Sequence, residues 1–252
     1  MVDIHSHILT DLDDGAKVFE VTTNLIDVAV RGGVTNIICT PHFLPDEQDL
    51  EEFLKLRQVS FDKTEKYILE NNIPLKIHLG LEISFNPSLI EMIDGLKNID
   101  SKIMVKNLCL AESRYMLLEL PNTTFPIWAE QYFFELQLRG IIPVIAHIER
   151  YEWSMSEKEQ LCKWAESGVI FQANASLLDF AHTSKHNKTR RYLLKNDLIS
   201  LVASDAHDIQ GRSMNSLLEV FGDNSKIKQE DCKKWVRNGF TILENNDIIL
   251  PE

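Results

Sequence analysis

The sequence has few cysteines and no paired cysteine motif. Cys39, Cys109, Cys162 and Cys232 are scattered, and no CxxC occurs. The N-terminus also lacks a basic segment followed by an apolar one, so we expect reduced thiols in a cytoplasmic protein without a signal peptide. No apolar run approaches the roughly 18 residues that a membrane-spanning helix needs, which predicts no membrane insertion.

Positive charge is also sparse. The chain has 26 Lys and Arg against 38 Asp and Glu, a formal net charge of −12. A nucleic-acid binder needs a basic face, and the densest basic cluster, Lys185–Lys195, is more typical of a solvated helix face. No GxGxxG follows the first predicted strand, so a dinucleotide-binding fold has no positive support.

What the sequence does contain is an alternation of short apolar runs with longer amphipathic ones. This pattern predicts a parallel sheet covered by helices, in a closed or nearly closed (β/α) barrel, with a doubly wound open sheet as the alternative. The predicted helices are Val18–Val30, Glu51–Leu69 and Pro126–Leu138. The predicted strands are Val2–His5, Asn36–Thr40, Leu75–Ile83, Tyr115–Leu120, Ile141–Ala146, Val169–Ala173 and Ile199–Ala203.

The segment 84–112 interrupts this rhythm between two strand ends, where a barrel places its active-site loops. We interpret it as a flap or an inserted hairpin. No internal repeat and no low-complexity linker is present, so we expect one domain over residues 1–252.

Metal-binding side chains follow most of the predicted strands. Because the carboxyl ends of parallel barrel strands meet on one face, they predict a shared site for two or three divalent ions. Residues two apart on a strand point the same way, so His5 and His7 could bind one ion. The residues at or just beyond the strand ends are His5, His7, His42, Glu82, Glu119, His147, Asn174, Asp205 and His207.

The remaining histidines and the early aspartates are weaker candidates. His78 is expected within a strand, and His182 and His186 in a polar loop. Asp14, directly before Gly15, is a candidate ligand, whereas Asp11 and Asp13 are expected to be solvated loop residues or turn formers.

An ordered set of motifs resembles the PHP (polymerase and histidinol phosphatase) superfamily over almost the whole chain. The motifs are DIHSHIL, DDGA, TPH, GLEI, LLEL, AHIERY, QANASLL and SDAHDIQGR. Within the superfamily they most resemble the metal-dependent bacterial protein-tyrosine phosphatases of capsule and exopolysaccharide gene clusters.

The resemblance implies a distorted (β/α)7 TIM-like barrel of the PHP type with three divalent metal ions, Mn²⁺ first, with Fe and Zn as alternatives. It implies that His5, His7, Glu82 and Asp205 hold the first ion. Glu82, Glu119 and His147 would hold the second, and Asp14, His42 and His207 the third. Arg150 and Arg212 would bind the substrate phosphate, and His207 could supply a proton.

The implied reaction is hydrolysis of phosphotyrosine by a metal-activated hydroxide. By resemblance, the substrate is the tyrosine-rich tail of an autophosphorylating kinase that controls capsule or exopolysaccharide synthesis. A small-molecule phosphomonoesterase, such as a histidinol-phosphate phosphatase, is the alternative, and a non-enzymatic barrel with a relic site is a third possibility that the full ligand set disfavours. Oligomeric state is not readable from the sequence.

Two features qualify the resemblance. Ile148 stands where a proline usually follows the histidine of the AHIERY motif, and the 84–112 segment is longer than is typical. Thiolate chemistry is excluded separately, because cysteine tyrosine phosphatases need an Arg six positions after the cysteine. Pro45, Tyr115, Gly168 and Asn238 occupy those positions here.

Overall fold

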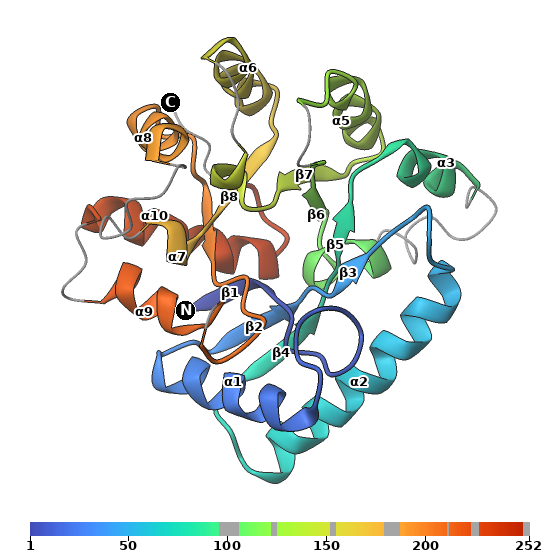
Figure 1. Ribbon diagram of the computed structural model, residues 1–252, viewed down its shortest axis with the longest axis vertical. Helices are drawn as coiled ribbons and strands as arrows, with labels where there is room; N and C mark the ends of the chain where they lie inside the picture. Colours follow the sequence, from blue (N-terminus) through green and yellow to red (C-terminus); the bar gives the residue numbers. More distant parts are fainter. Residues whose placement is uncertain are drawn as a thin grey trace.

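The computed structural model describes residues 1–95, 106–121, 125–151, 155–178, 187–210, 212–222 and 227–248. They form an α/β structure in which the strands gather at the centre and helices surround them (Figure 1). The described strands are β1 (Val2–Ser6), β2 (Asn36–Cys39), β3 (His42–Phe43), β4 (Lys76–Leu79), β5 (Glu82–Ser84), β6 (Tyr115–Glu119), β7 (Ile142–Ile145), β8 (Ile170–Asn174) and β9 (Leu201–Ala203).

Every strand pairing is parallel, as the sequence pattern predicts. One sheet has the order β1-β2-β4 and the other the order β3-β5-β6-β7-β8-β9. A parallel bridge between Ser6 and Ala206 links the end of β1 to the chain just beyond β9. The two sheets therefore continue one another as a single curled parallel arrangement.

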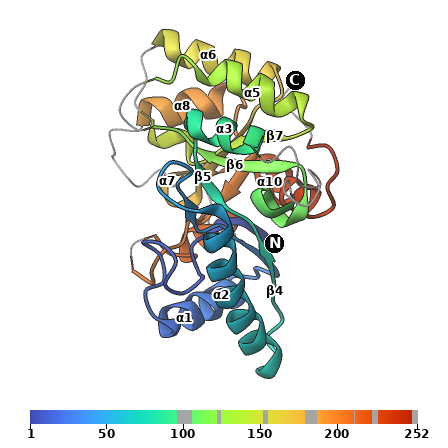
Figure 2. The same cartoon turned by 90° about the vertical axis from the view of Figure 1, so that its right-hand side faces the viewer.

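The helices cover the outside of this curled sheet, with α1 and α2 together at one end of the molecule and α5 and α6 at the other (Figures 1 and 2). The predicted helices are confirmed, with shifts of at most three residues at their ends. The described α-helices are α1 (Phe19–Arg31), α2 (Leu50–Glu70), α3 (Pro87–Gly95), α5 (Ala129–Leu138), α6 (Met155–Glu166), α7 (Ala175–Leu178), α8 (Asn187–Lys195), α9 (Asn215–Phe221) and α10 (Gln229–Leu243). Two short 3-10 helices are η1 (Leu110–Glu112) and η2 (Ile148–Arg150).

The predicted third strand, Leu75–Ile83, is divided by a break at Gly80 and Leu81. A Cβ atom on Gly80 would lie 2.8 Å from Ile38 Cγ2, so the close approach to β2 requires glycine. The second predicted strand, Asn36–Thr40, corresponds to β2, and a further short strand that the sequence did not predict, β3, follows it after Thr40 and Pro41. β2 pairs with β4 and β3 with β5, so both breaks lie at the same level of the sheet.

On the inner face of the curled sheet, apolar side chains are followed by polar side chains at the carboxyl ends of the strands. Leu117 precedes Glu119, Ile170 precedes Gln172, and Ala203 precedes Asp205, each by two residues, and the apolar members share one buried cluster. Alternation along a strand therefore carries the polar residues onto the same inner face.

β1 departs from this alternation through a bulge. Its register with β2 shifts between Asp3 and Ser6. Val2 and Ile4 belong to the inner apolar cluster, yet His5, the next residue, also reaches the inner face. Bulges beside functional sites re-aim side chains in this way.

The interpreted flap, 84–112, is described only in part, and residues 96–105 lie outside the described residues. Its described portions are the end of β5, helix α3, residues 106–109 and the 3-10 helix η1. His182 and His186 also lie outside the described residues. Within the described residues, no helix is both long enough and apolar enough to cross a bilayer.

Candidate metal centre

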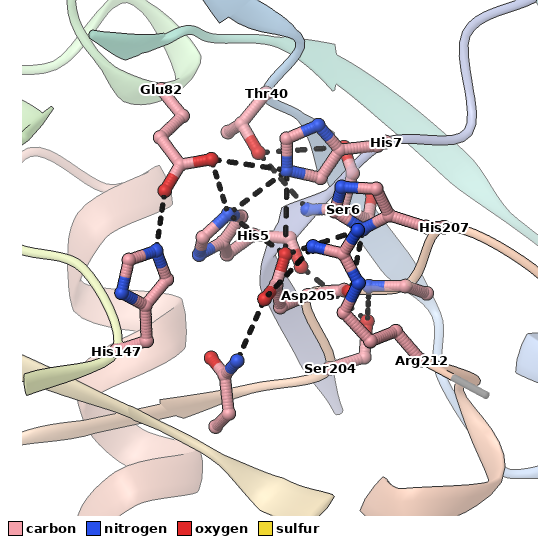
Figure 3. Close-up of polar contacts among 12 residues, drawn as sticks. His5, Ser6, His7, Thr40, Glu82, His147, Ser204, Asp205, His207 and Arg212 are labelled. Atoms are coloured by element: carbon pink, nitrogen blue, oxygen red, sulfur yellow. Dashed lines mark hydrogen bonds and ion pairs between the residues drawn. The ribbon is translucent and has the colours of Figure 1, made fainter. Parts of the chain in front are cut away.

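The carboxyl ends of the strands converge, as predicted, and bring all nine candidate metal ligands into one cluster. Figure 3 shows the buried ones gathered together, with Glu82 opposite His5 and His7. The buried side chains are His5, His7, Glu82, His147, Asp205 and His207, and the partly exposed ones are His42, Glu119 and Asp14.

The first group of ligands is formed by His5, His7, Glu82 and Asp205. His5 Nε2 lies 3.1 Å from both His7 Nε2 and Glu82 Oε2, and 3.4 Å from Asp205 Oδ1. His7 Nε2 lies 3.2 Å from Glu82 Oε2 and 3.4 Å from Asp205 Oδ1. Ligand atoms sharing one ion at about 2.0–2.2 Å are separated by roughly 3.0–3.5 Å, so these spacings fit a divalent ion.

Hydrogen bonds behind the two histidines fix which ring nitrogen faces the group. His5 Nδ1 lies 3.1 Å from Gln172 Oε1, and His7 Nδ1 lies 2.6 Å from Asp13 Oδ2. Both partners are acceptors, so Nδ1 of each ring carries a proton, and Nε2 presents a lone pair when the ring is in the neutral form that a metal ligand requires. Two lone pairs and two carboxylate oxygens then face one another, an arrangement that a cation satisfies.

Asp13 therefore differs from its sequence interpretation. It is a turn former, since its Oδ1 accepts from Gly15 N at 2.9 Å. It is not a solvated loop residue, because its side chain is only 4% exposed and its Oδ2 also accepts from His42 N. Burial raises its pKa, but the bond and charge of His7 outweigh burial and lower the pKa to about 2.

Glu82 lies between the first and second groups. Its Oε2 is buried, and three imidazole nitrogens surround it at 3.1–3.2 Å. Nevertheless, no donor among the described residues makes a hydrogen bond to this oxygen with good geometry. Its Oε1 lies 2.9 Å from His147 Nε2. Burial raises the pKa of Glu82, but the neighbouring histidines outweigh it and hold the pKa well below its usual range. Glu82 is thus an ionised carboxylate with one oxygen toward each group.

The second group contains Glu82, Glu119 and two histidines. His147 Nε2 lies 3.5 Å from Glu119 Oε1, and His42 Nδ1 lies 3.8 Å from Glu119 Oε2. His42 thus lies beside this group as well as beside the third group, to which the resemblance assigned it. Burial and then the charge of Glu82 raise the pKa of Glu119 to about 7, a crowding of carboxylates that a cation relieves.

The third group is formed by His7, Asp14, His42 and His207. Asp14 Oδ1 lies 3.0 Å from His207 Nε2 and 3.5 Å from His42 Nε2. His207 Nδ1 donates to the backbone oxygen of Asp205 at 2.9 Å, which again leaves its Nε2 unprotonated. Burial lowers the pKa of His207 to about 4, so the ring is neutral at pH 7, as a ligand must be.

The two arginines of the predicted phosphate clamp lie at the edge of the cluster. Arg150 Nη2 donates to Asp205 Oδ2, and its side chain is 28% exposed. Arg212 Nη2 donates to Asp14 Oδ2 at 3.0 Å, with its side chain 37% exposed. Both guanidinium groups therefore lie against the carboxylates of the site and remain open to solvent.

Two of the candidate ligands have a left-handed backbone. His147 has φ 33° and Asp205 has φ 52°, values that L-residues adopt at a cost. Such conformations persist only where the surrounding structure holds them, and they are frequent at active sites. Each residue lies just beyond the end of its strand, so the turn directs the side chain into the cluster.

Sequence reasoning missed the residues that orient the ligands, namely Asp13 and Gln172. Neither residue is itself a candidate metal ligand. The only signal in the sequence is that each lies within two residues of a candidate, Asp14 or Asn174. His78, predicted to lie within a strand away from the site, does so: it is in β4, with Nε2 3.0 Å from Asn36 Oδ1.

The fold and the site define a class: an α/β protein with a curled parallel sheet whose carboxyl ends carry a polynuclear cluster of histidines and carboxylates. The chain belongs to the family described as capsular polysaccharide synthesis, CpsB/CapC, whose profile matches residues 1–236. This is the branch of the PHP superfamily that the motifs indicate, so that prediction is confirmed.

Individual relatives agree with this assignment. The candidate tyrosine-protein phosphatase CapC of Staphylococcus aureus is 33% identical over 98% of this chain and 93% of its own length. The tyrosine-protein phosphatase YwqE of Bacillus subtilis is 31% identical, with the same two coverages. A crystal structure from a study of YwqE and Streptococcus pneumoniae CpsB, described as metal-dependent tyrosine phosphatases, superposes with a TM-score of 0.83. It is 28% identical and covers 100% of this chain and 98% of the other.

Proposed function

We propose that the protein is a metal-dependent protein-tyrosine phosphatase that hydrolyses phosphotyrosine. The single observation that carries this proposal is the convergence of three overlapping ligand groups at the strand ends. Relatives of nearly the same length that are named tyrosine-protein phosphatases support the substrate class.

The proposed assignment of ligands follows the three groups. His5, His7, Glu82 and Asp205 would hold one divalent ion, Glu82, Glu119 and His147 a second, and Asp14, His42 and His207 a third. The mixture of imidazole and carboxylate suits Mn²⁺, with Fe and Zn as alternatives. When bound, such ions supply a hydroxide nucleophile at neutral pH and neutralise charge on the phosphoryl oxygens.

The chain itself supplies substrate binding and orientation. The proposed phosphate clamp consists of Arg150 and Arg212, whose planar forks can bind phosphoryl oxygens in a bidentate manner. Because both side chains are partly exposed at the edge of the cluster, a phosphate can reach them from solvent. His207 also has a proposed proton-donor role, but its lowered pKa supports its role as a ligand more strongly.

A cavity beside the cluster supports the proposal that the substrate carries an aromatic leaving group. It has a volume of about 370 Å³ and opens between the loop that carries Asp14 and the segment after β3. Leu12 and Leu44 give it apolar walls, while Asp14, His42 and Glu119 border it on the side of the cluster. A phenyl ring could pack against the leucines while its phosphate faces the metal groups.

The finer parts of the proposal concern substrate and setting. We propose that the physiological substrate is the phosphorylated tail of a tyrosine kinase involved in capsule or exopolysaccharide synthesis, and that the protein acts in the cytoplasm. The family description supports a link to capsular polysaccharide synthesis.

The architecture is proposed to be one domain with a distorted barrel of seven strand positions. β2 with β3 and β4 with β5 would each count as one interrupted strand, and the Ser6–Ala206 bridge would close the circle. The 84–112 segment would form a flap beside the site.

The test is hydrolysis by the purified protein, loaded with Mn²⁺, of a phosphotyrosine peptide and of histidinol phosphate. The proposal predicts a much larger kcat/KM for the peptide. A preference for histidinol phosphate would favour the small-molecule phosphatase, and inactivity on both with full metal content would contradict the proposal.

A further inference from the structure

Strand β8 carries two buried amide side chains, Gln172 and Asn174, on the inner face of the sheet. Both residues are completely buried. Gln172 Nε2 donates to Asn174 Oδ1 at 2.8 Å, and Gln172 Oε1 accepts from the backbone N–H of His147 at 2.9 Å. Since a backbone N–H can only donate, the orientation of the Gln172 amide is fixed, and that of Asn174 follows from it.

The two ends of this pair contact two candidate ligands of the first group. Gln172 Oε1 accepts from His5 Nδ1 at 3.1 Å, which leaves Nε2 of the neutral ring unprotonated. Asn174 Nδ2 donates to Asp205 Oδ2 at 2.7 Å. Oδ1 of Asp205 is left facing His5 and His7 (Figure 3). One chain of hydrogen bonds thus joins a ligand on β1 to a ligand beyond β9.

These hydrogen bonds can form in only one orientation of the two amide groups. Reversing the Gln172 amide would place its NH₂ group against two donors, His5 Nδ1–H and the His147 N–H. Reversing Asn174 would place its oxygen against the carboxylate of Asp205. In a fully buried site, each such mismatch leaves polar groups unpaired at a cost of about 1–3 kcal/mol.

We propose that Gln172 and Asn174 are positioning residues that set the metal-binding state of His5 and Asp205 together. Gln172 selects the His5 tautomer, and Asn174 selects the Asp205 oxygen that faces the ion. This inference rests on the proposed function in one respect, that the first group holds a divalent ion. Partners behind metal ligands typically change metal affinity by roughly 10- to 100-fold when removed.

The test is a titration of the metal-free protein with Mn²⁺, followed by the electron paramagnetic resonance signal of free Mn²⁺. Gln172→Met and Asn174→Leu should each weaken the tightest site by roughly 10- to 100-fold. The matched control is Asn238→Leu. Asn238 on α10 is also a buried amide, and it donates to the Ser200 oxygen at 2.8 Å, before the start of β9. It should lower the Tm and leave Mn²⁺ affinity within twofold of wild type.

A conservative variant separates this role from simple packing. Gln172→Glu keeps an acceptor for His5 Nδ1 and loses the donor to Asn174. In the Zn²⁺-loaded protein, a long-range ¹H–¹⁵N spectrum should show the His5 proton on Nδ1 in wild type and Gln172→Glu, and a perturbed ring in Gln172→Met. Mn²⁺ affinity should be partly restored relative to Gln172→Met.

The outcomes distinguish the two proposals. Wild-type protein that binds no Mn²⁺ would overturn the proposed metal-dependent function, and the positioning role with it. Wild-type binding with both variants within twofold, or with a loss equal to that of Asn238→Leu, would overturn the positioning role alone. If Gln172→Met does not fold, Asn174→Asp takes its place, because it keeps the bond to Gln172 but sets an oxygen against Asp205. Unchanged affinity in that variant would equally overturn the role.

Discussion

Arg150 and Asn174 donate to the same carboxylate oxygen of Asp205, Oδ2, so that Oδ1 faces His5 and His7. Arg150 thus orients a candidate ligand in addition to its proposed contact with phosphate. Arg212 also contacts a candidate ligand, Asp14, but that side chain is 58% exposed, so the loss of Arg212 should disturb its position less.

This difference predicts distinct effects for the two arginines. Arg212→Ala should keep metal content and lose on the order of 10²-fold in kcat/KM, because it removes a contact to the transition state. Arg150→Ala should lose at least as much activity and also weaken metal binding, since Asp205 loses a charged partner. Metal content by mass spectrometry, measured beside kcat/KM, checks both.

A lysine at either position gives the matched comparison. Arg→Lys should restore activity only in part, because an ammonium cannot reproduce the planar fork. Metal-replete alanine variants that hydrolyse a phosphotyrosine peptide within twofold of wild type would show that the phosphate is bound elsewhere.

Removal of metal should abolish activity and lower stability. Burial lowers the pKa of His5 and His7, but the neighbouring carboxylates outweigh it and raise the pKa of both rings. Without a cation, only protons on these rings balance the carboxylates of the first group. A bound metal ion should stabilise the folded protein further, so EDTA should lower the Tm as well as the rate. Added Mn²⁺ should restore both better than Zn²⁺. Full activity after chelation, with metal loss confirmed, would contradict the mechanism.

Glu82→Gln should be the most damaging change to a single ligand. Glu82 directs one oxygen to the first group and the other to the second, so loss of its charge should lower metal content at two positions. Activity should fall by at least about 10²-fold. Normal metal content in Glu82→Gln would refute the shared role.

His78→Ala is the control, because His78 lies in β4 before the break. This change should cost only about 1 kcal/mol of stability through the lost bond to Asn36.

Gly15→Ala should disable the site without altering any candidate ligand. A Cβ atom there would lie 2.3 Å from His7 O and 2.5 Å from His7 Cβ, so the loop carrying Asp13 and Asp14 must move. We expect weaker Mn²⁺ binding and a large loss of rate. Gly95→Ala at the end of α3 meets nothing within 4 Å and serves as the control. Equal activity of the two variants would show that the loop tolerates displacement.

Thiol reagents should leave the activity largely intact. Cys39 and Cys109 are buried, and burial raises the pKa of both thiols, so neither forms a reactive thiolate in the folded protein. Iodoacetamide should modify Cys162 and Cys232 first, as peptide mass spectrometry can establish. Complete inactivation through Cys39 in folded protein would count against the metal mechanism.

The sequence by itself determined the parallel α/β fold and the candidate ligands. Period-two and helical patterns are local, and parallel strands necessarily present their carboxyl ends on one face. His5, Glu82, His147 and Asp205 could therefore be assigned to one site from their positions at strand ends alone.

Only the tertiary structure decided how the ligands are grouped and oriented. His42 lies between the second and third groups, and Asp13 and Gln172 fix the tautomers of His7 and His5. These roles depend on hydrogen bonds between atoms up to 167 residues apart, which no local pattern encodes. The break at Gly80 and the bulge in β1 likewise arise from close packing between strands rather than from the propensity of either segment.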